Sequence, residues 1–372
     1  MNVPLLDLKA QHQAIKDAVV PKVLELAEAQ LFILGQPVQE LEQRLAELSR
    51  ARFGIGVASG TDALLVPLKA LDLKPGDEVI TTPFTFFATA GAIHNAGGKP
   101  VFVDVEPGTW NIDPAAVEAA ITPRTRAIMP VHLFGQMAAM EKLVPLAERH
   151  GVPLLEDAAQ AIGARRRVGG TWRVAGELGT ATGFSFFPSK NLGGWGDGGM
   201  VVANDQRIAD RVRALRMHGG LRTYYHDEVG TNSRLDALQA VVLLAKLPYL
   251  AGWSAARRAN AARYGQLLAG SPAVCTPVTD PANEHIFHQY VIECDRRDAL
   301  LAHLKAHEIG CAVYYPLALH LQPCFRFLGY REGAFPVAEA ATRRVLALPV
   351  YPELTEAQQH YVADTIRGYY GT

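Results

Sequence analysis

Apolar runs with the character of strands alternate with helical patterns through the first two-thirds of the chain. The runs predicted to be strands cover residues 77–83, 100–105, 126–135 and 152–159. Between them a helix is expected from Asp113-Pro114, because an N-cap residue precedes proline there. Another helix is expected to end at Gly151. Continuous apolar strands are typical of a sheet covered on both faces, so we expect an α/β fold with a mostly parallel sheet between helices.

The last third of the chain predicts a smaller α+β domain. A helix over 206–220 is followed by a long helix expected to begin at Ser233, and we place the domain change on that helix. This divides the chain into residues 1–245 and 246–372. Beyond it we expect a strand over 288–294, a helix over 296–307 and a last helix from Thr355, where Thr355 and Gln358 fit a capping box.

Charge and composition exclude several kinds of partner. The net charge is −1 and no lysine/arginine tract is present, which argues against nucleic acid and anionic membranes. The most apolar helix-like stretch, 241–250, is too short to span a bilayer, and no signal peptide is recognisable. The four cysteines are widely spaced, as in proteins of a reducing compartment, so a cytoplasmic location is expected.

Two motifs resemble known binding sites but do not meet their requirements. "GIGVASG" (54–60) resembles a dinucleotide fingerprint, but its glycine spacing does not fit a nicotinamide site. "HLKAH" places His303 and His307 on one helical face, but the glutamate of a zinc protease and a third ligand are missing. We therefore expect no metal site.

The residues that indicate chemistry are Asp157 and Lys190. Asp157 ends an apolar strand, where a charge is costly unless it is paired, and Lys190 follows the next strand. Asp157 could simply be an N-cap or loop aspartate. Alternatively, pyridoxal phosphate needs an aspartate that keeps its ring nitrogen protonated and a lysine that holds its aldehyde. Because ligands of parallel sheets lie beyond the strand ends, the pair predicts such a site.

The cofactor's phosphate needs hydrogen-bond donors. Gly60 and Thr61 precede a helix and would offer N–H groups and a hydroxyl at its positive end, although a good N-cap would look the same. Ser185, five residues before Lys190, offers a further hydroxyl. Phe86 is predicted either to stack on the ring or to pack in the core.

The whole chain resembles the pyridoxal-phosphate-dependent sugar aminotransferases of the DegT/StrS type, which have the aspartate-aminotransferase-like fold (fold type I). Similar blocks occur in the family's order: "PLLDLKAQ", "FILGQPVQELE", "ASGTDAL", "PFTFFATA", "EDAAQAIGA", "SFFPSKNLGGWGDGG" and "GTNSRLDALQA". The resemblance implies a large domain with a seven-stranded sheet, a small C-terminal domain and a homodimer with shared active sites.

The resemblance also implies a role for each matched residue. Lys190 would hold the cofactor and move the proton. The other cofactor contacts would be Asp157 at the ring nitrogen, Gln160 at the phenolic oxygen, Phe86 on the ring, and Gly60, Thr61 and Ser185 at the phosphate. Asn232 would reach the phosphate of the neighbouring subunit. The alternative for Asn232 is an N-cap of the long helix, a role that Ser233 could fill at the same time. Tyr315 and His320 fall where the family shapes its sugar pocket, although Tyr315 could be a core residue. Many members have histidine where this chain has Phe187, which suggests a changed substrate wall.

The implied reaction moves an amino group from glutamate to a nucleotide-linked keto sugar. Residues 224–240 resemble members that aminate C3 slightly more than those that act at C4. A dehydratase of the same fold is disfavoured, because those enzymes carry histidine in place of Lys190. A cyclitol-ketone aminotransferase that uses glutamine, and a cofactor-binding regulator without turnover, remain as alternatives.

Overall fold

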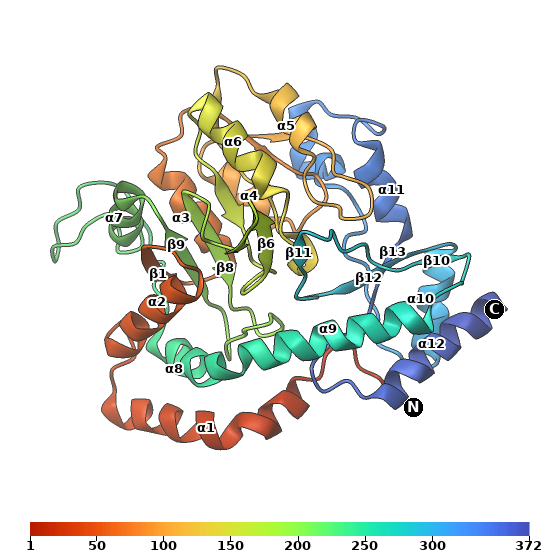
Figure 1. Ribbon diagram of the computed structural model, residues 1–372. Coiled ribbons are helices and arrows are strands. Elements are labelled where there is room, and N and C mark those ends of the chain that lie inside the picture. The colour runs from red at the N-terminus through yellow and green to blue at the C-terminus, as the bar shows by residue number, and fades with distance from the viewer. Residues whose placement is uncertain (372) are drawn as a thin grey trace.

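The expected central sheet is present in the computed structural model, which describes residues 1–371 (Figure 1). In spatial order its strands are β1 (Phe53–Val57), β9 (Gly199–Ala203), β8 (Ala181–Ser185), β5 (Leu155–Asp157), β4 (Thr125–Ile128), β2 (Glu78–Thr81) and β3 (Lys99–Phe102). Parallel bridges Ile128–Leu154 and Val131–Asp157 join β4 to β5. Within the described residues only β9 runs against its neighbours, so the mostly parallel seven-stranded sheet is confirmed.

Helices cover both faces of this sheet. They are α2 (Gln36–Leu48), α3 (Gly60–Ala70), α4 (Ala88–Asn95), α5 (Pro114–Ala120), α6 (Met140–His150), α7 (Gln206–Leu215) and α8 (Ala237–Lys246), and α1 (Leu8–Ala29) packs against α8. Neighbouring strand residues point to opposite faces. Val79 and Val201 belong to the core cluster with α3, α4 and α7, whereas Ile80 and Val202 belong to the cluster with α2, α5, α6 and α8. Burial on both faces explains why the strands lack polar alternation.

The strand predicted over 126–135 is only partly correct. The regular ladder of β4 ends at Ile128, and after the bridge at Val131 the chain forms the 3-10 turn η1 (Leu133–Gly135). Pro130 has no N–H for a ladder hydrogen bond, although its carbonyl accepts one from Asp157. After this irregular end the chain turns away from the direction of β4, next to the edge of the sheet where the candidate site lies.

The C-terminal part has its own antiparallel sheet of β10 (Val274–Cys275), β12 (Tyr290–Cys294) and β13 (Val345–Leu348). Its helices are α9 (Leu250–Leu267), α10 (Arg297–Ala306), α11 (Pro336–Arg344) and α12 (Glu356–Tyr370), and the short 3-10 helices η3 (Leu319–Leu321) and η4 (Pro323–Leu328) precede α11. The predicted capping box at Thr355 and Gln358 is confirmed. A hairpin of β6 (Arg165–Val168) and β7 (Thr171–Val174), with β11 (Asn283–Glu284) beside β6, links the two parts.

The long helix begins later than expected. α8 starts at Ala237 because the Ser233 hydroxyl does not cap it; that hydroxyl donates to Asp62 (2.6 Å) and accepts from the N–H of Ala58 (3.3 Å). The turn η2 (Leu247–Tyr249) continues α8 into α9. The proposed division at residues 245/246 falls at this junction and stays a prediction. The N-terminal Val3 pairs with Ile309 and packs in the C-terminal core.

The continuous run also changes one expectation about membranes. Ala237–Leu267 is long and apolar enough to cross a bilayer by length and composition, whereas the sequence suggested that no stretch was long enough. Of its most apolar window, 56% is buried inside the fold, and a helix of the protein core passes the same test.

Candidate active site

A cavity of about 600 Å³ opens at the carboxyl ends of β5 and β8, where α3 begins. The predicted site residues that line it are Gly60, Thr61, Phe86, Asp157, Gln160, Ser185, Lys190 and Tyr315. Asn232 and His320 do not line it. Residues up to 255 positions apart therefore meet at one edge of the sheet, as expected for ligands of parallel sheets.

Asp157 is a buried carboxylate that faces the cavity, and it is 5% exposed. The Thr89 hydroxyl donates to one carboxylate oxygen (2.7 Å) and the N–H of Ala159 to the other (3.2 Å). Burial raises the pKa of the Asp157 carboxyl above its ordinary value, and these two donors act in the opposite direction. A buried carboxylate held in this way attracts a cationic group such as a protonated ring nitrogen.

Lys190 lies on the same cavity, in the turn that follows β8. Its backbone N–H donates to the carbonyl of Phe187 (2.8 Å), which fixes the turn. Loss of hydration lowers the pKa of the Lys190 amine from 10.5 to about 8, against the attraction of Asp157. More of this amine is therefore neutral near pH 7 than in an ordinary lysine, and most of it is neutral above about pH 8, as a nucleophile or base must be.

The start of α3 forms the other end of the cavity. Ser59 caps the helix by accepting the N–H of Asp62 (3.1 Å), and within residues 1–371 the N–H groups of Gly60 and Thr61 have no hydrogen-bond acceptor. An added Cβ at Gly60 would lie 2.6 Å from the Ser185 hydroxyl oxygen, so only glycine lets that hydroxyl approach the helix. Free N–H groups, a positive helix end and two hydroxyls match a phosphate.

Aromatic and amide side chains form the wall between these two ends. The Gln160 amide donates to the Tyr315 hydroxyl (3.0 Å) and accepts from the N–H of Phe134 (2.7 Å), so its oxygen and nitrogen have fixed positions. Phe86 is 57% exposed at the cavity, with its ring centre 6.3 Å from that of Tyr315. The core alternative for Phe86 is therefore wrong, and the ring is free to stack on a ligand.

Two of the predicted residues lie elsewhere. His320 is buried in η3, where its Nε2 contacts Glu339 (3.1 Å) and its ring packs edge-on against Phe335. Asn232 is exposed beside α7, and Met217 pairs with it. Within one subunit neither residue reaches the cavity.

Sequence reasoning missed three residues beside the site: Thr89, Asn191 and His288. His288 lines the cavity, and its Nδ1 lies 3.0 Å from the Asn191 amide oxygen. Since the Asn191 amide nitrogen donates to the carbonyl of Ile286, its oxygen must accept, and Nδ1 of His288 carries the proton. Burial lowers the pKa of His288 well below its ordinary value, so the ring is neutral. In the sequence His288 and Asn191 are 97 positions apart, and only the fold pairs them.

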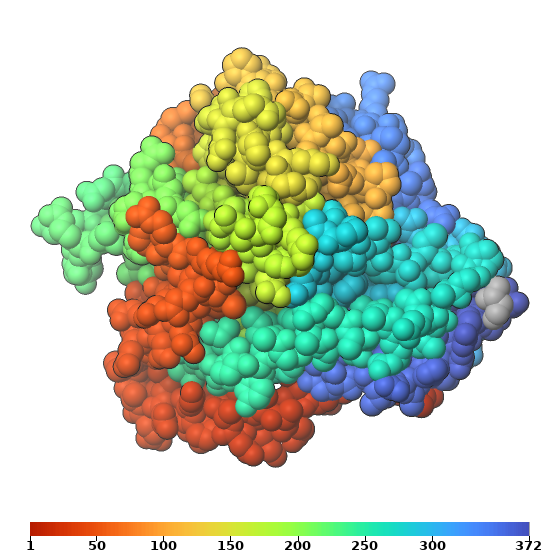
Figure 2. All heavy atoms as spheres, viewed as in Figure 1, coloured from red at the N-terminus to blue at the C-terminus, as the bar shows by residue number. Residues whose placement is uncertain are grey.

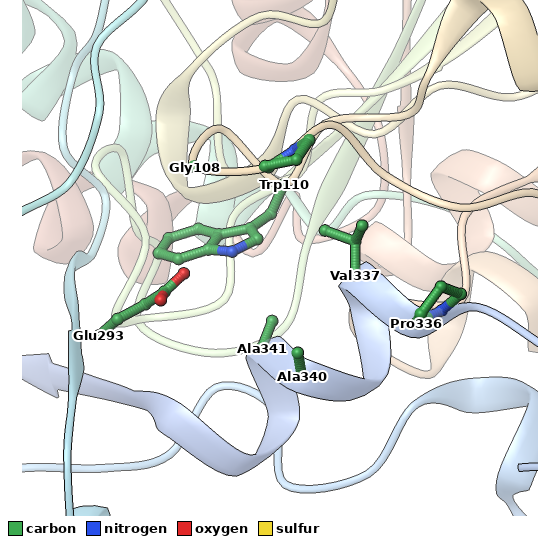
Figure 3. Close-up of a pocket in the computed structure, with 8 residues that line it drawn as sticks. Gly108, Trp110, Glu293, Pro336, Val337, Ala340 and Ala341 are labelled. Carbon is green, nitrogen blue, oxygen red and sulfur yellow. The ribbon is translucent and has the colours of Figure 1, made fainter. Parts of the chain in front are cut away.

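A second hollow in the surface has few polar side chains. It lies between residues 107–110 and α11, and the carboxylate of Glu293 points over the ring of Trp110 (Figure 3). The other lining residues are apolar or glycine, and Arg344 already lies 3.5 Å from Glu293. Among the described residues no group of three or more His, Cys, Asp or Glu side chains is arranged to hold a metal ion.

The donor set of the first cavity fits pyridoxal phosphate. A buried carboxylate suits the ring nitrogen, a partly neutral lysine suits the aldehyde, and the start of α3 suits the phosphate. On this sheet topology the three features together define a pyridoxal-phosphate-dependent enzyme. The model of the DegT/DnrJ/EryC1/StrS aminotransferase family matches residues 13–367, and the chain belongs to that family.

Known proteins similar to this chain agree with that assignment. A "pleiotropic regulatory protein" of Geobacillus stearothermophilus is 51% identical over all of this chain and 99% of its own. A UDP-N-acetyl-3-dehydro-alpha-D-glucosamine 3-aminotransferase of Acidithiobacillus ferrooxidans is 44% identical over 98% of this chain and 97% of its own. The crystal structure of S. venezuelae DesV in complex with a ketimine intermediate superposes with a TM-score of 0.95, at 41% identity, over 99% of this chain and 98% of that one.

Proposed function

We propose that this aminotransferase moves an amino group from glutamate to the keto carbon of a nucleotide-linked sugar, at C3 rather than C4. The observation that carries the proposal is the presence of Lys190 and Asp157 on one cavity beside a phosphate-binding helix start. The Acidithiobacillus ferrooxidans relative is named for amination at C3, which supports the sugar class and the position.

Each cavity residue has a proposed task. When bound, pyridoxal phosphate supplies an aldehyde that can take up the amino group and a ring that accepts electrons. Asp157 would keep the ring nitrogen protonated, and Thr89 would hold the carboxylate in place. Gly60, Thr61 and Ser185 would bind the phosphate, the amide nitrogen of Gln160 would donate to the phenolic oxygen, and Phe86 would cover one ring face.

Lys190 would move the protons. Its neutral Nζ takes the proton from the α-carbon of the amino donor, and in the second half of the cycle Nζ returns a proton to the former keto carbon of the sugar. The lowered pKa of about 8 keeps enough of the amine neutral for the first step. The cavity walls of Phe86, Tyr314 and Tyr315 would limit the entry of water.

The active unit would be a homodimer. The segment around residues 221–229 stands out from the body of the molecule, at the left of the view (Figure 2). Leu221, Tyr224 and Val229 in this segment are 71%, 91% and 92% exposed, which is unusual for large apolar side chains. A second copy would bury them, and the resemblance to the family implies that Asn232, which follows this segment, then reaches the neighbouring cavity. The four cysteines are all free, which supports a reducing, cytoplasmic location.

The test is a product assay with nucleotide-linked 3-keto and 4-keto sugars, with glutamate or glutamine as donor and a cyclitol ketone as a further acceptor. Mass spectrometry and NMR locate the new amine. We expect an amino group at C3 with glutamate, and none with Lys190→Ala. Amination only at C4, only of the cyclitol, or only with glutamine would contradict the proposal.

One observation favours a second candidate. The relative at 51% identity is named a regulatory protein, so a cofactor-binding regulator without turnover is the alternative. Such a regulator would bind the cofactor and give no amine from any acceptor. Multiple turnovers in the product assay would exclude it.

A further inference from the structure

The glycine-rich turn after Lys190 is held against α8 by two buried side chains that have no part in the proposed reaction. They are Gln239 and Lys246, which are 7% and 4% exposed. Seven residues apart on α8, they lie on the same face of the helix. The Gln239 amide oxygen accepts the N–H of Trp195 (2.7 Å), and the Lys246 amine donates to the carbonyl of Gly193 (2.7 Å).

Two glycines of this turn, Gly194 and Gly196, lie directly against the Gln239 side chain, and Gly193 lies against the backbone of the turn itself. An added Cβ at Gly194 would lie 2.6 Å from the Gln239 amide oxygen, and one at Gly196 would lie 2.9 Å from its nitrogen. An added Cβ at Gly193 would lie 2.3 Å from the carbonyl oxygen of Pro188. These glycines do not have positive φ values. Gly194 and Gly196 therefore allow close approach of α8, and Gly193 allows the turn to fold on itself, without an unusual backbone conformation.

Burying the amine of Lys246 at this position on α8 costs free energy. Burial lowers the pKa of Lys246 to about 8, and among the described residues no charged neighbour opposes that shift. Its neutral and charged forms both carry N–H groups, so either can donate to Gly193. The cost of burying an unpaired amine is consistent with a requirement for this hydrogen bond.

Backbone hydrogen bonds connect the part of the turn that contacts Gln239 and Lys246 to Lys190. The N–H of Gly194 donates to the carbonyl of Phe186 (2.8 Å), and the N–H of Lys190 donates to that of Phe187 (2.8 Å). The turn is thus tied to the end of β8 on one side and to α8 on the other. We propose that Gln239 and Lys246 are positioning residues, which hold the turn 187–196 and so fix where the Lys190 amine points.

Hydrogen exchange tests the proposal without depending on turnover, although the catalytic meaning of the turn rests on the proposed role of Lys190. The full-length protein is compared with Lys246→Met and Gln239→Met, and thermal unfolding establishes that each is folded. We expect the amides of Lys190 and Gly194 to exchange about 10-fold faster in both variants, because a lost hydrogen bond opens the turn locally. Neither amide bonds to the replaced side chains, so the change reports on the turn itself.

Two matched variants define the controls. Gln239→Glu keeps an acceptor for Trp195 and should retain slow exchange, and Lys305→Met removes an exposed lysine of α10 and should change nothing. In Lys246→Met and Gln239→Met, kcat should fall, whereas the KM for the amino donor should change little. The reason is that these variants lose the orientation of the Lys190 amine and not the binding of the donor. Unchanged exchange at Lys190 and Gly194 in folded variants would overturn the inference. If Lys246→Met does not fold, Gln239→Met decides the question alone.

Discussion

An added Cβ at Gly60 would lie 2.5 Å from the Cβ of Ser185, so the start of α3 and the end of β8 touch where the phosphate is expected. Gly60→Ala would push them apart. We expect cofactor affinity to fall by at least about 10-fold and stability by roughly 1–3 kcal/mol, as for an overpacked site. Fluorescence titration with pyridoxal phosphate and urea unfolding measure the two effects.

The matched control is Gly252→Ala in α9, where an added Cβ meets no atom within 4 Å. Alanine is the better helix former, so this variant should gain about 0.5–1 kcal/mol and bind the cofactor normally. Equal affinity in both alanine variants would show that the Gly60–Ser185 contact does not shape the site.

Thr89 makes the hydrogen bond that should matter most to Asp157. Thr89→Val removes the hydroxyl but keeps the shape, so the buried carboxylate loses its 2.7 Å donor and its pKa rises further. A hydrogen bond to a charged group contributes about 1.5–3 kcal/mol, which predicts a roughly 10- to 100-fold slower reaction with the amino donor. Thr89→Ser should restore most of the rate. If Thr89→Val reacted as fast as the wild type, the Thr89 hydroxyl would have no role in holding Asp157.

Lys190 should make the stability of the cofactor-free protein depend on pH. Its pKa is about 8 in the folded state and 10.5 ordinarily, so between these values the unfolded chain binds more protons. The destabilisation is complete below about pH 8 and is relieved as pH rises towards 10.5. Lys190→Met should therefore be more stable than the wild type near neutral pH, with the difference shrinking in alkali. Urea unfolding of both proteins across this range provides the measurement, and a constant difference would be inconsistent with a buried amine.

The proposed homodimer with shared active sites predicts complementation between defective subunits. Lys190→Ala and Asn232→Ala subunits, tagged differently and co-expressed, form a hybrid dimer in which one cavity carries both changes and the other carries neither. By two-fold symmetry the hybrid should have about half the activity of the wild-type dimer, while each parent has little. A hybrid no more active than its parents would place Asn232 outside the neighbouring site.

Much of the fold was predictable because local chemistry determined it. The strand ends that carry Asp157 and Lys190 were recognisable from apolar runs, and Asp113 and Thr355 do cap their helices. The reversed direction of β9 was not predictable, since an apolar strand looks the same in either direction. The β6–β7 hairpin had a signal, the pair Gly169-Gly170 with positive φ, that the sequence interpretation did not use.

The candidate site was predictable only in part, because some of its residues depend on contacts between distant parts of the chain. Residues at strand ends, such as Asp157 and Ser185, follow from the topology. Thr89 and His288 depend on pairings with residues 68 and 97 positions away, which no local pattern shows. Ser233 matched an N-cap pattern, yet its hydroxyl binds Asp62, because a contact with α3 competes with the helix end.

The central claim is that Lys190 carries the cofactor, and the chain contains a built-in comparison. Lys246 is buried and its pKa is also about 8, but unlike the half-buried Lys190 it does not line the candidate cavity. Borohydride reduction of the purified protein would fix the cofactor's aldehyde carbon to the amine that holds it, and peptide mass mapping would identify the lysine. The account predicts the pyridoxyl group on Lys190 alone, and none in Lys190→Ala. Its attachment to Lys246 or any other lysine, or unchanged labelling of Lys190→Ala, would contradict the account.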